Sequence, residues 1–428
     1  MESGRKFKQQ EMKNRNTLFT AFIAMFLTTT GLVAQDGGFI YGKLTTIDGK
    51  TYEGPMRWGK EEVYWTDMFN ASKERNENID YLSREDIRRL ERFYERRNYG
   101  WGDRIAGWFD SRWNDSRWDN DYVHQFSCQF GELKSLRMSG RKYVDVELQN
   151  GDKFEVDGDG YNDIGSEIKI MDTEIGEMVF RWSRIDKIDF MKTPNSLNDK
   201  FGEPLYGTVE TYGGAFTGYV QWDHDERVDT DKLDGDTYDG DVSIQFGKIK
   251  SIERDGNRSI VVMNSGREME LRGSNDVNSS NRGIIVNTEF GRVDIPWREF
   301  KRVTFEGKAT KMKSYDQFGS QKELTGVVKT VDGDTFSGRI IYDLDETFDY
   351  EVLQGKDDDI EYIIPFRYIK SVTPKNYDNS NVVLKSGEKL FLGDAQDVSD
   401  RNTGLLVFEG KGEPRYLLWN DIDEVTFN

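Results

Sequence analysis

The chain has 428 residues, which is too long for one ordinary domain, so several compact units are expected. Apolar residues make up 36% of it, and 42 glycines beside 7 prolines indicate many tight turns and exclude a proline-rich spacer. The formal net charge is −19 at pH 7, and so acidic a protein repels phosphate backbones, which argues against nucleic acid as a general partner. A single cysteine, Cys128, excludes an intramolecular disulfide framework.

Residues 1–34 have the pattern of an export signal. They contain five basic and two acidic side chains, followed by an apolar run from Leu18 to Ala34 that offers a small residue for cleavage before Gln35. The alternative is an uncleaved anchor, since about 17 apolar residues is the lower limit for spanning a bilayer. No cysteine follows the apolar run, so a lipoprotein anchor is not expected. We therefore expect an exported protein, periplasmic, cell-surface or secreted, and loss of the signal would change its charge from −19 to −22.

One phrase occurs three times after the signal. It reads "GKLTTIDGKTYEG" from Gly42, "GTVETYGGAFTG" from Gly207 and "GVVKTVDGDTFSG" from Gly326. Each copy closes on a shared signature, which is "CQFGELKSL" from Cys128, "IQFGKIKSI" from Ile244 and "IPFRYIKSV" from Ile364. A second set of related segments follows each signature, with an aspartate at the same offset, namely Asp163, Asp276 and Asp397. The chain therefore contains three large repeats, each a pair of related units of roughly 50 residues.

The repeats carry strand patterns. "VELQNGDKFEV" alternates apolar and polar residues about an Asn-Gly pair, which is a strong hairpin signal. We predict an all-β fold of tandem small β-barrels in three paired modules. The modules are expected at 35–193, 204–306 and 324–428, with a polar linker at 307–323.

The segment "DGDTFSGRIIYD", from Asp332 to Asp343, resembles the first signature of Sm-like small barrels, and SH3-like barrels share this pattern. The resemblance implies about six such units in the chain. In Sm-like proteins an asparagine soon after the aspartate and a later Arg-Gly pair hold RNA. Here Asp343 is followed by Leu344 and Asp345, and Pro365 stands with Phe366 in the closing signature, so RNA binding does not transfer.

An insertion at residues 72–121 is found only in the first repeat. Leu82-Ser83 followed by Asp86 predicts a helix start, and Ile87, Leu90 and Tyr94 would share one helical face. The later part is rich in tryptophan and arginine and is the candidate partner-binding surface, for a protein, a glycan or a membrane interface. The alternative is that this face packs on its own barrel pair. The candidate contact residues are Trp101, Trp108, Arg112, Trp113, Arg117 and Trp118.

Few residues are suited to catalysis or metal binding. His124, His224 and Cys128 are too few for a zinc site or a nucleophile with its base, so no catalytic residue and no cofactor is predicted. The loop from residue 223 to residue 241 is acidic, although no register in it fits an EF-hand. It gives four calcium candidates, for which the alternative is a solvated acidic turn: Asp223, Asp225, Asp229 and Asp231.

These patterns favour a non-enzymatic binding or scaffolding protein of the cell envelope. The expected partner is a protein or glycan of the envelope, with peripheral membrane contact through the insertion and no nucleic acid. The alternative is a carbohydrate-active hydrolase that uses carboxylates for catalysis and the insertion tryptophans as a sugar platform.

Overall fold

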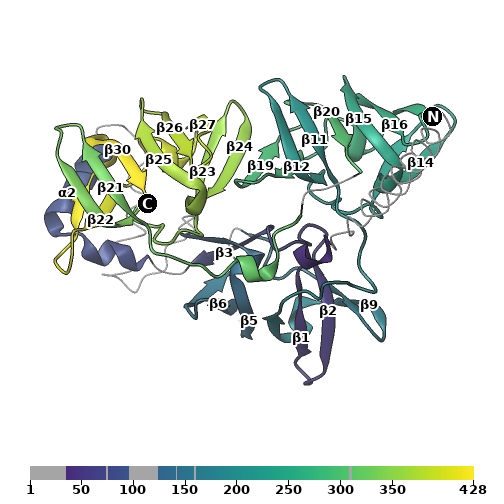
Figure 1. The fold of residues 1–428 in the computed structure, drawn as a ribbon, viewed down its shortest axis with the longest axis horizontal. Coiled ribbons are helices and arrows are strands. Elements are labelled where there is room, and N and C mark those ends of the chain that lie inside the picture. The colour runs from purple at the N-terminus through teal and green to yellow at the C-terminus, as the bar shows by residue number, and fades with distance from the viewer. Residues whose placement is uncertain (1–34, 74–75, 96–123, 141, 159–160, 308–310) are drawn as a thin grey trace, which may run out of the picture.

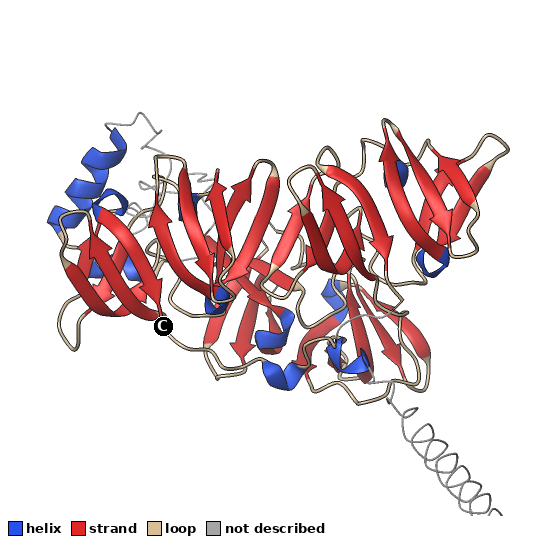
Figure 2. Cartoon of the chain, turned by 45° about the horizontal axis from the view of Figure 1, so that its top comes forward, coloured by secondary structure: helices blue, strands red, loops and turns tan. Residues whose placement is uncertain are grey.

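The computed structural model describes residues 35–428 except 74–75, 96–123, 141, 159–160 and 308–310. The predicted export signal lies outside the described residues. Within them the chain is mostly strand, with one α-helix and several short 3-10 helices, so the all-β prediction is confirmed (Figure 2). The strands form antiparallel sheets, none of which closes on itself within the described ranges. Among the helices of the described part, none is long and apolar enough to cross a membrane.

Repeat 1, residues 35–193, forms one ten-stranded sheet. Its spatial order is β4-β3-β7-β6-β5-β10-β1-β2-β8-β9. The strands are β1 (Tyr41–Thr46), β2 (Thr51–Trp58), β3 (Met68–Lys73), β4 (His124–Gln129), β5 (Leu133–Ser139), β6 (Tyr143–Leu148), β7 (Lys153–Asp157), β8 (Ile168–Asp172), β9 (Gly176–Phe180) and β10 (Ile185–Phe190). The 3-10 helices outside the insertion are η1 (Gln35–Gly38), η3 (Phe130–Glu132) and η4 (Trp182–Arg184).

Repeat 2, residues 204–306, has the same strand order, except that its β13–β14 hairpin joins the rest only through the isolated bridge between Asp236 and Arg272. Its strands are β11 (Tyr206–Thr211), β12 (Ala215–Trp222), β13 (Lys232–Asp236), β14 (Asp241–Gln245), β15 (Ile249–Asp255), β16 (Arg258–Met263), β17 (Glu268–Leu271), β18 (Ile284–Asn287), β19 (Arg292–Ile295) and β20 (Phe300–Phe305). Its 3-10 helices are η5 (Phe246–Lys248) and η6 (Asn275–Val277).

Repeat 3, residues 324–428, follows the order of repeat 1 strand for strand. Its strands are β21 (Thr325–Thr330), β22 (Thr335–Ile341), β23 (Val352–Asp357), β24 (Ile360–Pro365), β25 (Ile369–Pro374), β26 (Asn379–Leu384), β27 (Lys389–Gly393), β28 (Leu405–Phe408), β29 (Arg415–Leu417) and β30 (Ile422–Phe427). Its 3-10 helices are η8 (Phe366–Tyr368), η9 (Gln396–Val398) and η10 (Trp419–Asp421).

The two halves of each repeat exchange strands. In repeat 1 the first hairpin, β1–β2, pairs with β10 and β8 of the second half, where Met56 lies opposite Ile170. The second-half hairpin β6–β7 pairs in turn with β5 and β3 of the first half, where Ser72 lies opposite Asp157. Each five-stranded group in space therefore combines both halves of the sequence, and the paired units predicted from sequence are interleaved.

Repeats 2 and 3 share one eighteen-stranded sheet. The join is an antiparallel pairing of β19 with β24, with Val293 opposite Tyr362. One apolar core runs through both repeats and buries Trp222 in the first of them and Tyr342 in the second. These two repeats lie side by side in Figure 1, with repeat 1 below their junction.

The predicted linker, 307–323, is described except for residues 308–310, and its part from residue 311 packs on repeat 1. Its 3-10 helix η7 (Tyr315–Gln317) places the Tyr315 hydroxyl 2.7 Å from the Leu133 carbonyl oxygen. The Tyr315 ring lies 4.6 Å from that of Trp65, and Phe318 joins the apolar core of repeat 1. This segment therefore contributes to the packing of the repeats.

The insertion begins with η2 (Glu77–Tyr81) and α2 (Arg84–Glu95). The predicted start of α2 is confirmed, because Ser83 Oγ accepts a hydrogen bond from the Asp86 amide at 3.2 Å. The helix leaves repeat 1 and packs on repeat 3, where Leu90 is fully buried beside Leu418. The Tyr94 hydroxyl also donates to the Arg401 carbonyl oxygen at 2.7 Å. The described part of the insertion thus ties the first repeat to the third.

Candidate functional site

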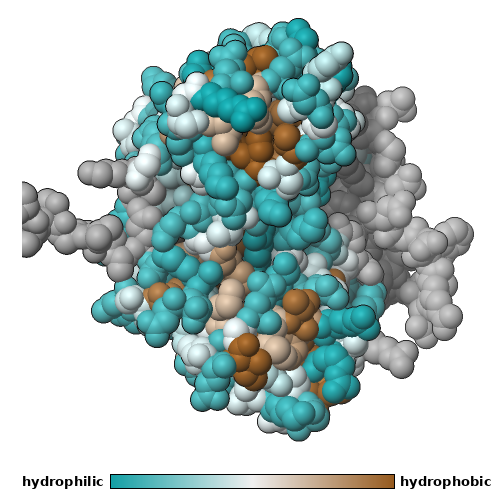
Figure 3. Space-filling model, turned by 90° about the vertical axis from the view of Figure 1, so that its right-hand side faces the viewer, coloured by the Kyte–Doolittle hydropathy of each residue, from teal (hydrophilic) through white to brown (hydrophobic). Residues whose placement is uncertain are grey.

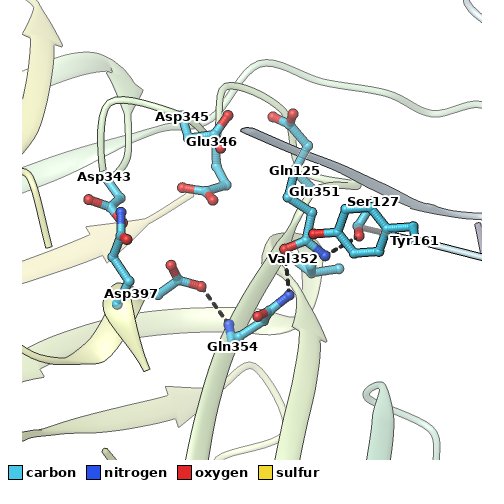
Figure 4. A pocket seen from close by; sticks show the side chains of 11 residues that line it. Gln125, Ser127, Tyr161, Asp343, Asp345, Glu346, Glu351, Val352, Gln354 and Asp397 are labelled. Carbon is cyan, nitrogen blue, oxygen red and sulfur yellow. Dashed lines mark hydrogen bonds between the residues drawn. The ribbon is translucent and has the colours of Figure 1, made fainter. Parts of the chain in front are cut away.

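An acidic pocket of about 180 Å³ lies where repeat 3 faces β4 of repeat 1 (Figure 4). Most of its acidic side chains come from the loop after β22, and Asp397 enters from η9. The loop is tight because Tyr342 and Glu346 exchange two main-chain hydrogen bonds of 2.8 and 2.9 Å. The lining residues are Gln125, Ser127, Tyr161, Asp343, Asp345, Glu346, Glu351, Val352, Gln354, Gln396 and Asp397.

The carboxylates around this pocket hold the loop in shape. Glu351 Oε2 accepts hydrogen bonds from the amides of Thr347 and Phe348 at 2.6 and 2.9 Å. Asp397 Oδ2 accepts from the Gln354 amide at 2.6 Å. Asp343 Oδ1 accepts from the Thr403 hydroxyl at 2.6 Å. These bonds satisfy three main-chain donors and one side-chain hydroxyl that would otherwise be buried without a partner.

One cation from repeat 1 reaches the pocket. Lys73, on β3, lies 3.1 Å from Glu351 and 3.5 Å from Asp345. Burial opposes its charge, but Glu351 and Asp345 together raise the pKa of Lys73 above its usual value. The lysine therefore stays charged and links repeat 1 to repeat 3.

Several of these acids have raised pKa values, which favours their protonated forms. Burial, and then the neighbouring Asp397, raises the pKa of Glu346 and that of Asp343 well above their usual values. Burial also raises the pKa of Asp397 to about 7. Protonation removes the cost of burying several negative charges close together.

The same arrangement occurs in all three repeats. In each, a large aromatic residue at the end of a strand bonds to the main chain of the recurring aspartate. Trp58 Nε1 donates to the Asp163 carbonyl at 2.7 Å, Trp222 Nε1 to that of Asp276 at 2.9 Å, and the Tyr342 hydroxyl to that of Asp397 at 2.6 Å. Each aspartate also accepts a main-chain amide from the strand that follows the acidic loop, from Asn70, Asp234 and Gln354 at 2.6, 2.7 and 2.6 Å.

The electrostatics repeat as well. Burial, and then the aspartate of the same repeat, raises the pKa of Glu62 well above its usual value and that of Glu226 to about 9. Burial raises the pKa of Asp163 to about 7 and that of Asp276 to about 6. The recurring aspartates were visible in the sequence at a constant offset, but the glutamate four residues after each aromatic residue was missed. Aligning the acidic residues of the three phrases would have found it.

The four calcium candidates have protein partners. Asp223 Oδ1 accepts the Arg282 amide at 2.5 Å, and Asp225 pairs with the Arg282 guanidinium at 2.7 Å. Asp229 accepts the Glu203 amide at 2.7 Å, and Asp231 pairs with Arg57 of repeat 1 at 2.8 Å. Across the described ranges, no group of three or more His, Cys, Asp or Glu side chains is arranged to hold a metal ion.

The other residues singled out in the sequence are dispersed. Trp101, Trp108, Arg112, Trp113, Arg117 and Trp118 all lie outside the described residues. His224 pairs with Asp294 at 3.0 Å, whereas His124 begins β4. Burial, and then Glu132, raises the pKa of the Cys128 thiol well above its usual value. The histidines and the cysteine are therefore not brought into one site.

A larger cavity, of about 560 Å³, lies where all three repeats and the 311–313 segment meet. Five aromatic side chains line it, with amide and hydroxyl groups between them: Tyr206, Phe216, Tyr219, Phe290 and Tyr368. Burial, and then Arg367, lowers the pKa of Lys313 at this cavity to about 8. Thr66 Oγ1 is buried there and has no hydrogen-bond partner within the described structure.

Comparison with known proteins found no matching family model, no similar curated protein and no similar solved structure.

Proposed function

We propose that the protein is a non-enzymatic scaffolding protein, exported to the cell envelope, in which three repeats are locked together and the insertion serves as the contact surface. The buried acidic arrangement around Asp163, Asp276 and Asp397 is the observation that supports the scaffolding function most directly. It recurs in each repeat with the same main-chain hydrogen bonds, so its buried carboxyl groups are accounted for by folding alone. An enzyme instead concentrates groups with distinct tasks in one cleft.

We also propose that each five-stranded group is a small barrel-like unit of the SH3 or Sm type. In five of the six groups a 3-10 helix links the two outer strands of the group, as η3 links β4 to β5 and η4 links β9 to β10; in the sixth, a turn at residues 297–299 links β19 to β20. A unit of this size is marginal alone, and the exchange of strands between two units gives them a shared folding transition.

The insertion supports the contact role because its described part is fixed on repeat 3. Arg89 of α2 pairs with Asp421 at 3.0 Å, and the Tyr81 ring meets that of Phe408 at 5.1 Å. The chain that continues from α2 carries four tryptophans, which are among the residues most enriched in binding hot spots.

The test replaces the four insertion tryptophans, Trp101, Trp108, Trp113 and Trp118, with alanine. Partners are captured by cross-linking in intact cells and identified with wild-type protein and with the variant. We expect the specific partner to be lost while the melting temperature changes little. The matched control replaces the exposed aromatics Tyr212 and Tyr238 of repeat 2, which should keep the partner. Retention of the partner by the tryptophan variant would contradict the proposal.

A second candidate function is small-molecule binding in the 560 Å³ cavity. Its volume lies within the range of about 300–1,000 Å³ that ligand sites occupy. The buried Thr66 hydroxyl without a partner favours a ligand with a polar group. Native mass spectrometry with an oligosaccharide and metabolite panel, repeated on Phe290→Ala, tests this.

The rival function, a carbohydrate-active hydrolase, depends on the acidic pocket. The test measures turnover on a polysaccharide panel by the wild type and by Glu346→Gln. Activity that is lost in Glu346→Gln, at an unchanged melting temperature, would support the hydrolase function over the scaffolding function.

A further inference from the structure

Three equivalent strands, β9, β19 and β29, are each the last strand in the spatial order of their repeat. Two of them are covered within the chain. The edge of β19 pairs with β24, and beside β29 the Tyr416 side chain packs with Ile79 and Leu82 of the insertion. The third, β9, pairs only with β8 within the described residues.

The uncovered β9 edge carries apolar side chains in water. Val179 on the strand is 50% exposed and Ile175 in the preceding turn is 62% exposed. Met178 is half-buried, whereas Val293, its counterpart on the covered β19, is fully buried. The glycines at the starts of these edges differ in the same way: a Cβ on Gly291 would lie 2.4 Å from the Ile363 carbonyl oxygen of β24, while a Cβ on Gly176, the first residue of β9, would have no described atom within 4 Å. An exposed apolar edge strand is a template for pairing with another strand.

The chain also supplies a complementary edge. The β19 edge is covered by β24, and the strand of repeat 2 that corresponds to β24 is β14, which pairs only with β13 within the described ranges. The β13–β14 turn presents Tyr238, which is 94% exposed. Figure 1 places β9 and β14 at the same end of the molecule, and Figure 3 shows that end with apolar residues scattered among hydrophilic ones.

We propose that copies of this chain associate with one another, with β9 of one copy pairing with β14 of the next as β19 pairs with β24. The register follows from the internal joint, where Val293 faces Tyr362. Met178 takes the place of Val293, because it pairs with Ile170 as Val293 pairs with Val286. Val242 takes the place of Tyr362, because it pairs with Gly235 as Tyr362 pairs with Gly355.

This register sets Met178 opposite Val242 and Glu177 opposite Ser243. Continued outward, it sets Arg181, whose side chain is 83% exposed, opposite Asp239. The internal joint has a comparable ion pair between Arg298 of repeat 2 and Asp359 of repeat 3. An acidic residue, Asp241, faces Val179, so the pairing includes one unfavourable position.

The interface joins two different edges, so a joined pair of copies keeps one free β9 edge and one free β14 edge, to which further copies can add. The paired segment is short and the protein is strongly acidic, with a net charge of −19. Association is therefore weak at low ionic strength and strengthens as salt screens the repulsion between copies.

The experiment traps the register by disulfide formation. Full-length protein carrying both Glu177→Cys and Ser243→Cys is oxidised mildly and run on a non-reducing gel. We expect a ladder of linked species, at least tenfold more abundant than for a control pair of Glu177→Cys with Asp255→Cys, since Asp255 is exposed at the end of β15 and lies outside the proposed pairing. Cys128 is buried and does not compete. Mixing the two single variants should give only dimers. Ladders of equal intensity in both pairs, or dimers from Glu177→Cys alone, would overturn the proposal.

Sedimentation at rising concentration gives an independent readout. The wild type should grow in mass with concentration and salt, whereas Val179→Glu, which sets a second carboxylate opposite Asp241, should remain monomeric. Val331→Glu is the matched control, since Val331 is also exposed, at 61%, but lies on a hairpin of repeat 3. A wild type that stays monomeric at all salt concentrations would also overturn the proposal.

Discussion

Repeats 2 and 3 are joined by main chain, whereas repeat 1 is held to both of them by side-chain contacts, apolar ones and buried ion pairs. Between repeats 2 and 3 the backbone of β19 pairs with that of β24 over one continuous core. Between repeats 1 and 2, Asp67 pairs with the fully buried Arg227 and also accepts a hydrogen bond from Asn287 at 2.7 Å. Three copies of one sequence are thus assembled by two different physical means, and the second depends far more on ionisation.

The largest expected effect is a loss of stability with rising pH. The buried acids of the recurring arrangement have folded pKa values above their unfolded ones, so these groups bind more protons in the folded state. Their contribution is complete below about pH 4, the usual carboxyl pKa. It is lost as pH rises through about 6 for Asp276, 7 for Asp163 and Asp397, and 9 for Glu226.

We therefore expect the melting temperature to fall by several degrees between pH 5 and pH 9 in differential scanning calorimetry. Asp397→Asn keeps an acceptor for the Gln354 amide and mimics the protonated acid, so it should flatten part of the slope. A melting temperature that is constant or rises over this range would show that these acids are ionised in the folded protein.

Breaking the buried ion pair between repeats 1 and 2 should have the next largest effect. Asp67→Ala leaves Arg227 buried without its charge partner and removes the acceptor for the amides of Val63 and Tyr64, each 2.8 Å away. We expect a loss of about 3–5 kcal/mol in the free energy of unfolding, measured by urea denaturation. The control Asp423→Ala breaks the exposed pair with Lys329 and should change little. Equal effects would mean that burial does not distinguish the two pairs.

The main-chain pairing of β19 with β24, which joins repeats 2 and 3, should be sensitive to one added methyl group. Gly291 has φ near +154°, and an added Cβ would lie 2.4 Å from the Ile363 carbonyl oxygen. Gly291→Ala is expected to cost about 1–3 kcal/mol and to reduce hydrogen-exchange protection in β19 and β24. Gly214→Ala, in open space, is the matched control and should change protection in neither strand. Unaltered hydrogen-exchange protection in Gly291→Ala would mean that the pairing of β19 with β24 accommodates the added methyl group without opening.

Local sequence patterns predicted much of this structure but not how its pieces meet. Hairpin turns, the closing signatures and the start of α2 depend on residues close in sequence, such as Ser83 and Asp86, so they could be recognised. The exchange of β1–β2 with β6–β7 could not, because the two hairpins have similar patterns and either pairing buries the same apolar faces. The docking of α2 on repeat 3 depends on Leu418, more than 300 residues away, for which a single sequence gives no signal.

The candidate site shows the same division. The aspartates Asp163, Asp276 and Asp397 stood out in the sequence because they recur at a fixed offset. Their role did not, since a carboxylate that accepts a main-chain amide and one that performs chemistry look alike in sequence. Only the contacts with Asn70, Asp234 and Gln354 separate the two.

The smallest expected effect concerns the attachment of the insertion to repeat 3. The Tyr94 hydroxyl donates to the Arg401 carbonyl oxygen at 2.7 Å, while its ring is buried beside Leu90. Tyr94→Phe keeps the ring and removes only this hydrogen bond, so α2 should lose about 0.5–1.5 kcal/mol of local stability. Hydrogen exchange in α2 would measure the loss as faster opening of the helix, with global unfolding nearly unchanged. Tyr81→Phe is the control, because its ring also meets repeat 3 but its side chain is 44% exposed. If Tyr94→Phe instead lowers the stability of the whole protein, α2 does not open independently of the repeats. Its docking on repeat 3 would then stabilise the whole assembly, beside the main-chain pairing of β19 with β24 and the side-chain contacts of repeat 1.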